Sequence, residues 1–349
     1  MSKLLGVLRS RGFVNAITNE SQLARKLETP QTCYIGFDPT ADSLHIGNLL
    51  QLICLKHFQN AGHRTIALIG GATAMIGDPS GRSTERPLLT TEQIKNNTAG
   101  LAKSLSTVLH LDTSRSVLKD SENLFYKKEK ELAEGEAATL LLNNYDWFKD
   151  ISVLQFLRDV GKHFKIQQML NKHVIKSRMS TDGEEGISYT EFSYQLLQAY
   201  DFYHLYKNEN CILQIGGSDQ WGNITAGTQY IHKQVSGNEE DDSLAFGMTL
   251  PLITTADGKK IGKSTASGGA AIWLDSDRSK PFNFYQYFIN LTDADAKNFL
   301  PLFTFLPLEE ISTIQKQHDE NPHLRIAQKV LAERVTELIH GPEQAQQAK

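Results

Sequence analysis

The most constraining feature of this sequence is an alternation of short apolar runs, each ending at glycine or aspartate, with longer segments of helical periodicity. Strands are predicted at 32–38 (TCYIGFD), 65–71 (TIALIGG) and 211–217 (CILQIGG). Helices are predicted at 43–62, 189–207 and 218–233, the last with a Ser or Asp cap. A parallel pair of strands needs a long crossover connection, which the intervening helices supply. Strands that alternate with helices are therefore expected to pair in parallel. The pattern predicts an α/β fold with a Rossmann-like, doubly wound parallel sheet.

The pattern becomes wholly helical after residue 278. This change predicts a C-terminal α-helical domain at 278–349, beside an α/β domain at 1–277. The charged segment 112–136 lacks periodicity, so we expect an irregular insertion there. The final residues, GPEQAQQAK, are polar and indicate a tail. The first residues, MSKLLGVLRSRGF, are interpreted as an ordinary amphipathic helix rather than a transit peptide, because the sequence that follows, VNAITNESQLARKL, is typical of a folded domain.

Composition argues against several classes of protein. The chain has 349 residues, 40% of them hydrophobic, and it lacks an apolar run of about 18 residues that would predict a membrane span. Cys33, Cys54 and Cys211 are far apart, which indicates neither a disulfide framework nor a zinc site. Because the net charge is −4, a polyanion such as a nucleic acid would have to bind at a local basic patch. The stretch 158–178, with six Lys or Arg, is a candidate, although a solvated helical surface also explains it.

In doubly wound sheets, ligands bind beyond the carboxyl ends of the strands, so the strand-to-helix junctions carry the functional signal. The first junction, GFDPTADSLHIGN (36–48), predicts Asp42 or Ser43 as the helix cap, with His45 and Asn48 on one face of the first turn. Gly47 between them leaves room for a nucleotide, and a phosphate at this helix start would meet free N–H groups. Taken alone, HIGN also fits ordinary capping by chance.

Two further junctions and one helix face are ambiguous from the residues alone. Residues 69–87, with Asp78 in a turn and arginines beyond it, fit either a ligand loop or a turn with surface arginines. LQIGGSDQWGN (213–223) fits a ligand site or a tight turn with an N-cap. Tyr194, Gln198 and Asp201 share one helix face, as either a pocket wall or a satisfied buried network.

The segment DGKKIGKST (257–265) looks like a phosphate-binding P-loop but does not meet the pattern. Only three residues separate Gly258 from Gly262, and the residues that follow, TASGGAA, do not start a helix cleanly. The segment is therefore interpreted as either a lysine-rich mobile loop or a solvated turn.

The pair of HIGN (45–48) and KIGKS (260–264) resembles the His-Ile-Gly-His and Lys-Met-Ser-Lys-Ser signatures of class I aminoacyl-tRNA synthetases. With YIGFDPTADSLHIGN, GGATAMIGDPSGR, NNYDW, FLRDVGKHF, TEFSYQLLQAYDF and LQIGGSDQWGNITAG in order, the chain resembles the tyrosyl-tRNA synthetases of bacterial and organellar type from about residue 4 to its end. The resemblance implies activation of L-tyrosine by MgATP to tyrosyl-adenylate, transfer to the 3′ end of tRNA(Tyr), and a homodimer. It implies that 278–349 binds the anticodon and that 257–268 is a mobile lysine loop.

The resemblance also assigns residues to roles. It implies that Tyr34 and Asp201 bind the phenol hydroxyl of tyrosine, that Asp78, Tyr194 and Gln198 bind its ammonium, and that Asp219 and Gln220 approach its carboxylate and the ribose. The implied ATP site comprises Gly36, Asp38, Thr40, His45, Gly47, Asn48, Gly217, Asp219 and Lys263. The implied transition-state donors are Thr40, His45, Arg82, Arg86, Lys260 and Lys263, with Ser264 as a further one. No protein metal site is implied, and Mg²⁺ enters with ATP.

The sequence departs from the family pattern in places. Asn48 replaces the second signature histidine, Ile261 and Gly262 replace Met-Ser, and Arg82 stands where many relatives carry lysine. Asn48 and IGKS favour a mitochondrial location over a bacterial-type cytoplasm. The family normally continues into a small C-terminal RNA-binding domain, so we expect a truncated form with weakened tRNA affinity. The alternatives are an RNA-binding splicing factor on the same fold and a tryptophanyl-type synthetase, which Tyr34 and Asp201 disfavour.

Overall fold

The computed structural model describes residues 2–81, 84–109, 139–172, 175–176, 179, 186–237, 244–254 and 271–349. The predicted insertion at 112–136 and the predicted lysine loop at 257–268 therefore lie outside the described residues, as does Arg82.

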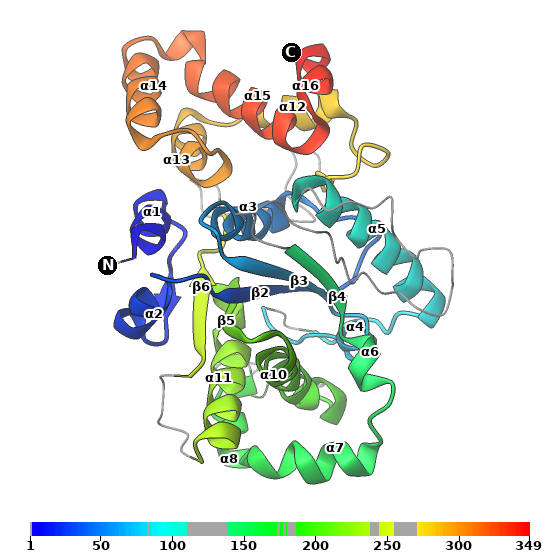
Figure 1. Cartoon of the computed structure of the whole chain (residues 1–349). Coiled ribbons are helices and arrows are strands. Elements are labelled where there is room, and N and C mark those ends of the chain that lie inside the picture. Colours follow the sequence, from blue (N-terminus) through cyan, green and yellow to red (C-terminus); the bar gives the residue numbers. More distant parts are fainter. Residues whose placement is uncertain are drawn as a thin grey trace, which may run out of the picture.

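Within the described chain, one sheet has the strand order β1-β6-β5-β2-β3-β4 (Figure 1). Its strands are β1 (Ala16–Ile17), β2 (Thr32–Phe37), β3 (Arg64–Ile69), β4 (Thr139–Asn143), β5 (Cys211–Gly217) and β6 (Phe246–Leu250). All neighbours pair in parallel except β1, which pairs antiparallel with β6. The chain winds from β2 towards β4 on one side and continues through β5 and β6 on the other. The doubly wound prediction is confirmed, and the switch point lies between β2 and β5.

Helices cover both faces of the sheet (Figure 1). One face carries α3 (Ile46–Asn60) and α5 (Thr91–Leu109), which contact β2 and β3; the other carries α10 (Tyr189–Glu209) and α11 (Trp221–Val235), which contact β5 and β6. Short elements follow the strand ends, namely α4 (Thr73–Ile76), α6 (Tyr145–Phe148) and the 3₁₀ turn η2 (Ser218–Gln220). This turn corrects the predicted Ser or Asp cap, because α11 begins at Trp221 after Gln220, without a side-chain cap.

The chain after residue 278 is helical, as predicted. It contains α12 (Pro281–Ile289), α13 (Asp293–Phe303), α14 (Leu308–Glu320), η3 (Pro322–Leu324), α15 (Ile326–His340) and α16 (Pro342–Ala348). The predicted polar tail is wrong, because it forms α16 and buries Ala345 and Ala348. Small alanines supply that contact, and they carry little signal in an otherwise polar segment.

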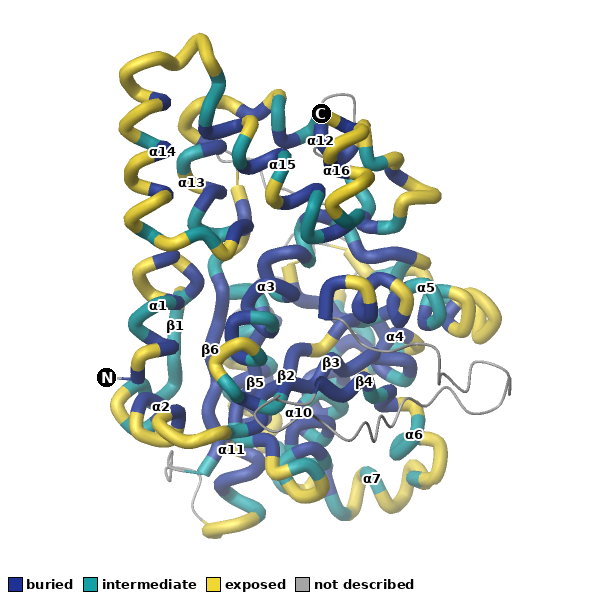
Figure 2. Tube along the Cα trace, turned by 45° about the horizontal axis from the view of Figure 1, so that its top comes forward, coloured by how far each residue is buried: buried dark blue, intermediate teal, exposed yellow. Residues whose placement is uncertain are grey.

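A single core cluster joins this helical region to the α/β part. It runs from α1 (Lys3–Arg11) through α3 to α12, α13 and α15, and Figure 2 shows the same buried path. Short helices elsewhere in the described chain include α2 (Glu20–Lys26), α7 (Val153–Asp159), η1 (Gly161–His163) and α8 (Ile166–Leu170). Among the residues described, none of the helices combines the length and apolar character needed to cross a bilayer.

Candidate active site

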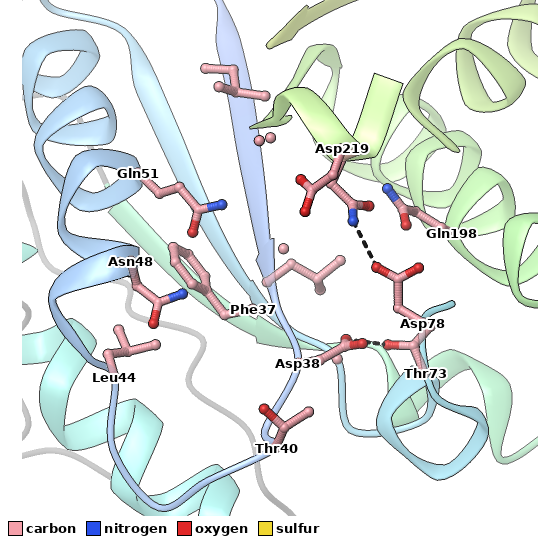
Figure 3. A pocket seen from close by; sticks show the side chains of 18 of the residues that line it. Phe37, Asp38, Thr40, Leu44, Asn48, Gln51, Thr73, Asp78, Gln198 and Asp219 are labelled. Atoms are coloured by element: carbon pink, nitrogen blue, oxygen red, sulfur yellow. Dashed lines mark hydrogen bonds between the residues drawn. The ribbon is translucent and has the colours of Figure 1, made fainter. Parts of the chain in front are cut away.

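A cavity of about 450 Å³ opens at the carboxyl ends of β2 and β5, at the switch point of the sheet. Figure 3 shows Asn48 and Gln51 of α3 on one side of it and Asp219 and Gln198 on the other. Every predicted site residue within the described chain lines this cavity: Tyr34, Gly36, Asp38, Thr40, His45, Gly47, Asn48, Asp78, Arg86, Tyr194, Gln198, Asp201, Gly217, Asp219 and Gln220. Arg82, Lys260, Lys263 and Ser264 lie outside the described residues.

The deep end of the cavity is formed by Tyr34 and Asp201. The Tyr34 side chain is 1% exposed, and none of the described residues forms a hydrogen bond with its hydroxyl. Asp201 accepts hydrogen bonds from Asn144 Nδ2 at 3.0 Å and from Trp147 Nε1 at 2.9 Å. Burial raises the pKa of Asp201 to about 8 and raises the pKa of Tyr34. A buried hydroxyl without a partner is costly, so this end suits a ligand that brings a polar group of its own.

Two more carboxylates, those of Asp38 and Asp78, line the same cavity. Asp38 accepts from Thr73 Oγ1 at 2.8 Å and from the Tyr194 hydroxyl at 2.9 Å. Burial, with Asp78 as the next cause, raises the pKa of Asp38 to about 6. Asp78 accepts from Gln220 Nε2 at 2.7 Å, which is one of the contacts drawn in Figure 3.

The carboxylates of Asp38, Asp78 and Asp201 form no ion pair within the described part of the chain. The nearby Arg86 donates from Nε to the backbone carbonyl of Asp78 at 2.9 Å rather than to a carboxylate. Buried acids are stabilised by a cation, so the arrangement suits a ligand with a positive group. The described residues hold no group of three His, Cys, Asp or Glu that would bind a metal ion.

The predicted helix cap at Asp42 or Ser43 is wrong, because α3 begins at Ile46 and His45 is its N-cap. His45 Nδ1 accepts from the Gly47 backbone N–H at 3.0 Å, and the Asn48 side chain accepts from the His45 N–H at 3.2 Å. An Nδ1 that accepts is unprotonated, so a neutral His45 carries its proton on Nε2. The capping box therefore makes His45 an N–H donor without a positive charge.

Two glycines show where the cavity is open and where it is filled. A Cβ placed on Gly36 in β2 would meet nothing within 4 Å, so open space lies directly above the strand. A Cβ on Gly70, at the end of β3, would lie 1.9 Å from Asp38 Oδ1 and 2.3 Å from Thr73 Oγ1. Gly36 therefore leaves room for a ligand, while Gly70 leaves room for the Asp38 carboxylate.

Asn144, Trp147 and Thr73 orient Asp201 and Asp38 and were not predicted from the sequence to have a role in the site. Asn144 Nδ2 also donates to Thr73 Oγ1 at 3.0 Å, so one hydrogen-bonded chain joins the two acids. The available signal was the position of Asn144 directly after a strand. That signal was missed because β4 itself was not predicted, and without the strand there was no junction to inspect.

Residues 26–349 match the family described as "tRNA synthetases class I (W and Y)". The tyrosine–tRNA ligase of Flavobacterium johnsoniae is 46% identical over 350 residues, covering 100% of this chain and 74% of the relative. That of Yersinia pestis is 46% identical over 346 residues, with coverages of 98% and 74%. The structure of a C-terminally truncated mitochondrial tyrosyl-tRNA synthetase from Aspergillus nidulans has a TM-score of 0.82 and 34% identity, covering 99% of this chain and 92% of that one.

Proposed function

Because the chain belongs to the class I tRNA synthetases of the tryptophan and tyrosine type, we propose that it is a tyrosine–tRNA ligase whose cavity forms tyrosyl-adenylate. It activates L-tyrosine with MgATP, releases pyrophosphate, and transfers the tyrosyl group to the 3′ end of tRNA(Tyr). The alternatives from the sequence were a tryptophanyl-type enzyme and a splicing factor on the same fold.

The single observation that carries the choice of tyrosine is the unpartnered Tyr34 hydroxyl beside Asp201. L-tyrosine has a phenol hydroxyl at one end and an ammonium at the other. The hydroxyl donates to Asp201 and accepts from Tyr34, while the ammonium meets Asp78, Tyr194 and Gln198. Phenylalanine would leave the buried pair unsatisfied, and tryptophan offers an N–H donor but no hydroxyl to accept from Tyr34.

ATP occupies the other half of the cavity, above Gly36 and along the start of α3. The carboxylate of tyrosine attacks the α-phosphorus of ATP, so a protein nucleophile or general base is not required. Catalysis is positioning and stabilisation of charge on the phosphates. His45 Nε2–H and Thr40 donate from one side, and Arg82, Arg86, Lys260 and Lys263 supply positive charge. Asp219 and Gln220 contact the ribose and the amino-acid carboxylate, and Mg²⁺ arrives with ATP.

The functional molecule is a homodimer. Support comes from exposed apolar side chains on α7 and α8: Val153, Leu154, Leu157, Ile166 and Leu170. Such a group on one edge of a chain is typical of a protein interface. The basic stretch 158–178 overlaps it and serves the interface or the acceptor stem of the tRNA.

Residues 1–277 act as the catalytic domain, and the helical region 278–349 contacts the anticodon arm. This division is supported by the change from strands to helices at α12. The compartment remains a prediction. The mitochondrial preference rests on Asn48 and IGKS, whereas the bacterial relatives have the higher identity, 46% against 34%.

Tyrosine-dependent exchange of labelled pyrophosphate into ATP tests the proposed function. Exchange is expected with tyrosine and not with phenylalanine or tryptophan. Exchange with tryptophan alone would support the tryptophanyl alternative, and RNA binding without exchange would support the splicing factor.

A further inference from the structure

Asn223 lies in the first turn of α11 and contacts two residues of the cavity wall without lining the cavity itself. Its Nδ2 is 3.2 Å from Gln220 Oε1, 3.3 Å from Ser80 Oγ and 3.5 Å from Asp78 Oδ1. The proposed function places Gln220 at the carboxylate of tyrosine and Asp78 at its ammonium. One side-chain amide therefore contacts the residues that would bind both charged groups of the substrate.

Asp78 determines which way the Gln220 amide points. An ionised carboxylate only accepts hydrogen bonds, so Gln220 turns its Nε2 towards Asp78 Oδ2, at 2.7 Å. Its Oε1 then faces Asn223, whose Nδ2 donates to it. A side-chain amide that is bonded at one end can still rotate about that bond, whereas bonds at both ends fix its plane. Asn223 therefore completes the orientation of Gln220.

Asp78 depends less on Asn223 than Gln220 does. Asp78 Oδ1 accepts from the Ser80 backbone N–H at 2.9 Å, a shorter bond than its 3.5 Å contact with Asn223. Loss of the Asn223 amide should therefore disturb Gln220 and leave Asp78 in place.

The orientation of Gln220 matters because its Nε2 carries two N–H bonds. Asp78 accepts from one of them, and the described residues form no hydrogen bond with the other. The plane of the amide sets the direction of this second N–H, and Gln220 lines the cavity. Resting on the proposed function, we propose that Asn223 is a positioning residue that directs the second N–H of Gln220 at the carboxylate of L-tyrosine.

The test compares equilibrium binding of two labelled ligands, L-tyrosine and tyramine, to the full chain and its Asn223→Leu variant. Tyramine keeps the phenol and the ammonium of tyrosine but has no carboxylate. We expect the Kd of tyrosine to rise on the order of tenfold, because a hydrogen bond to a charged group is weakened. The Kd of tyramine should stay within about twofold, because Asp78 and the deep end of the cavity are unchanged.

Asn223→Asp is a second variant that keeps the shape of the side chain but replaces the donor with an acceptor. It should also weaken tyrosine binding and leave tyramine binding no weaker than in the wild-type chain. Thermal melting shows that each variant is folded. Asn208→Leu, which removes an exposed amide that donates to the His204 carbonyl at 2.9 Å, is the matched control and should keep both Kd values.

The decisive comparison is with Gln220→Ala. If Asn223 acts through Gln220, the double variant Asn223→Leu/Gln220→Ala binds tyrosine no more weakly than Gln220→Ala alone.

Three results would overturn the proposal: an equal loss of tyrosine and tyramine binding in Asn223→Leu, losses that multiply in the double variant, or an unchanged Kd of tyrosine in both Asn223 variants. Failure of the proposed function is separate, because the wild-type chain itself would then show no tyrosine-dependent exchange of pyrophosphate.

Discussion

At the scale of single residues, the cavity is defined by polar groups that the protein leaves incomplete. Tyr194, Gln198 and Asp201 share one face of α10 and line the cavity, as a pocket wall would. The alternative of a buried network is also partly realised, because Tyr194 bonds Asp38 and Asp201 is bonded by Asn144 and Trp147. What the network does not satisfy is the Tyr34 hydroxyl and the charge of the acids.

Tyr34→Phe is expected to change stability and binding in opposite directions. Removal of an unpartnered buried hydroxyl should raise the free energy of unfolding by about 1 kcal/mol, while tyrosine binds about tenfold more weakly. Urea unfolding and tyrosine titration measure the two effects. Tyr230→Phe is the matched control, because that buried hydroxyl accepts from Gln234 Nε2 at 3.1 Å, so its loss should lower stability. A destabilised Tyr34→Phe protein would contradict the assignment.

The raised pKa of Asp201 predicts how the ligand-free protein responds to pH. Its pKa is about 8 in the folded protein, because burial disfavours the charge, against about 4 in the unfolded chain. Between these values the folded state binds more protons than the unfolded state, so the free energy of unfolding falls as pH rises from about 4 to 8. Melting curves should show this fall, with a smaller contribution from Asp38 up to about pH 6.

Asp201→Asn is the variant that checks the assignment, because an amide does not titrate in this range. Its Tm should depend less on pH between 6 and 8 than that of the wild-type protein. An identical pH dependence in both proteins would show that another group is responsible.

At the scale of elements, the ends of the parallel strands bring the site together. β2 supplies Tyr34 and Gly36, β3 leads to Gly70 and Thr73, and β5 leads to Gly217 and Asp219. Tyr34 and Gln214 are direct partners on β2 and β5, which puts the floor of the cavity at the switch point of the sheet. Short turns after each strand then direct polar side chains into one space.

Gly36→Ala and Gly70→Ala are expected to separate the ligand space from the folded core. A methyl group on Gly36 enters open space, so stability should hold or rise by about 0.5 kcal/mol, while adenylate formation falls about tenfold or more. A methyl group on Gly70 collides with the Asp38 and Thr73 side chains, so stability should fall by about 1–3 kcal/mol together with activity. Thermal melting and exchange assays check both. Normal activity in Gly36→Ala would place the ligand elsewhere.

At the scale of the whole molecule, the helical region is joined to the α/β part by burial and by one arginine. Arg11 of α1 is 6% exposed and donates to the carbonyls of Pro301, Thr304 and Leu306 at the end of α13. The Pro301 carbonyl belongs to the last turn of α13, where a helix leaves its carbonyls without intrahelical partners, and the other two belong to the segment that follows. Arg11, near the N-terminus, thus binds the backbone where α13 ends, in the C-terminal helical region.

Arg11→Met should lower the free energy of unfolding by about 2–4 kcal/mol, because it strands buried carbonyls. Urea denaturation measures the loss. Arg9→Met on the same helix removes only the exposed pair with Glu20, and its effect should stay within about 0.5 kcal/mol. Equal effects of the two changes would refute the role given to Arg11.

The proposed dimer is tested on α7. Leu154 is 81% exposed, so Leu154→Asp should not harm the folded monomer but should introduce a charge into an apolar interface. Sedimentation at micromolar concentration should give a dimer for the wild-type chain and a monomer for the variant. Leu324→Asp, at an exposed leucine of the helical region, should stay dimeric. A wild-type chain that sediments as a monomer would contradict the proposed homodimer.

The family, the doubly wound sheet and the C-terminal helices could be read from the sequence alone, because each depends on local periodicity and on motifs in order. Three strands were not predicted from the sequence. β1 has only two residues, β6 contains a glycine and a methionine, and β4 follows a segment without periodicity. The caps at His45 and Gln220 were also misplaced, because several polar residues precede each helix and backbone geometry selects among them.

The sequence by itself identified part of the cavity lining, since every predicted site residue in the described chain lines it. Only the tertiary structure decided which of their groups have no partner among the described residues, such as the Tyr34 hydroxyl, and which side chains support them, namely Asn144 and Trp147. The physical reason is that motifs and periodicity are properties of neighbours in the chain. Burial, unmet hydrogen bonds and shifted pKa values arise from neighbours in space.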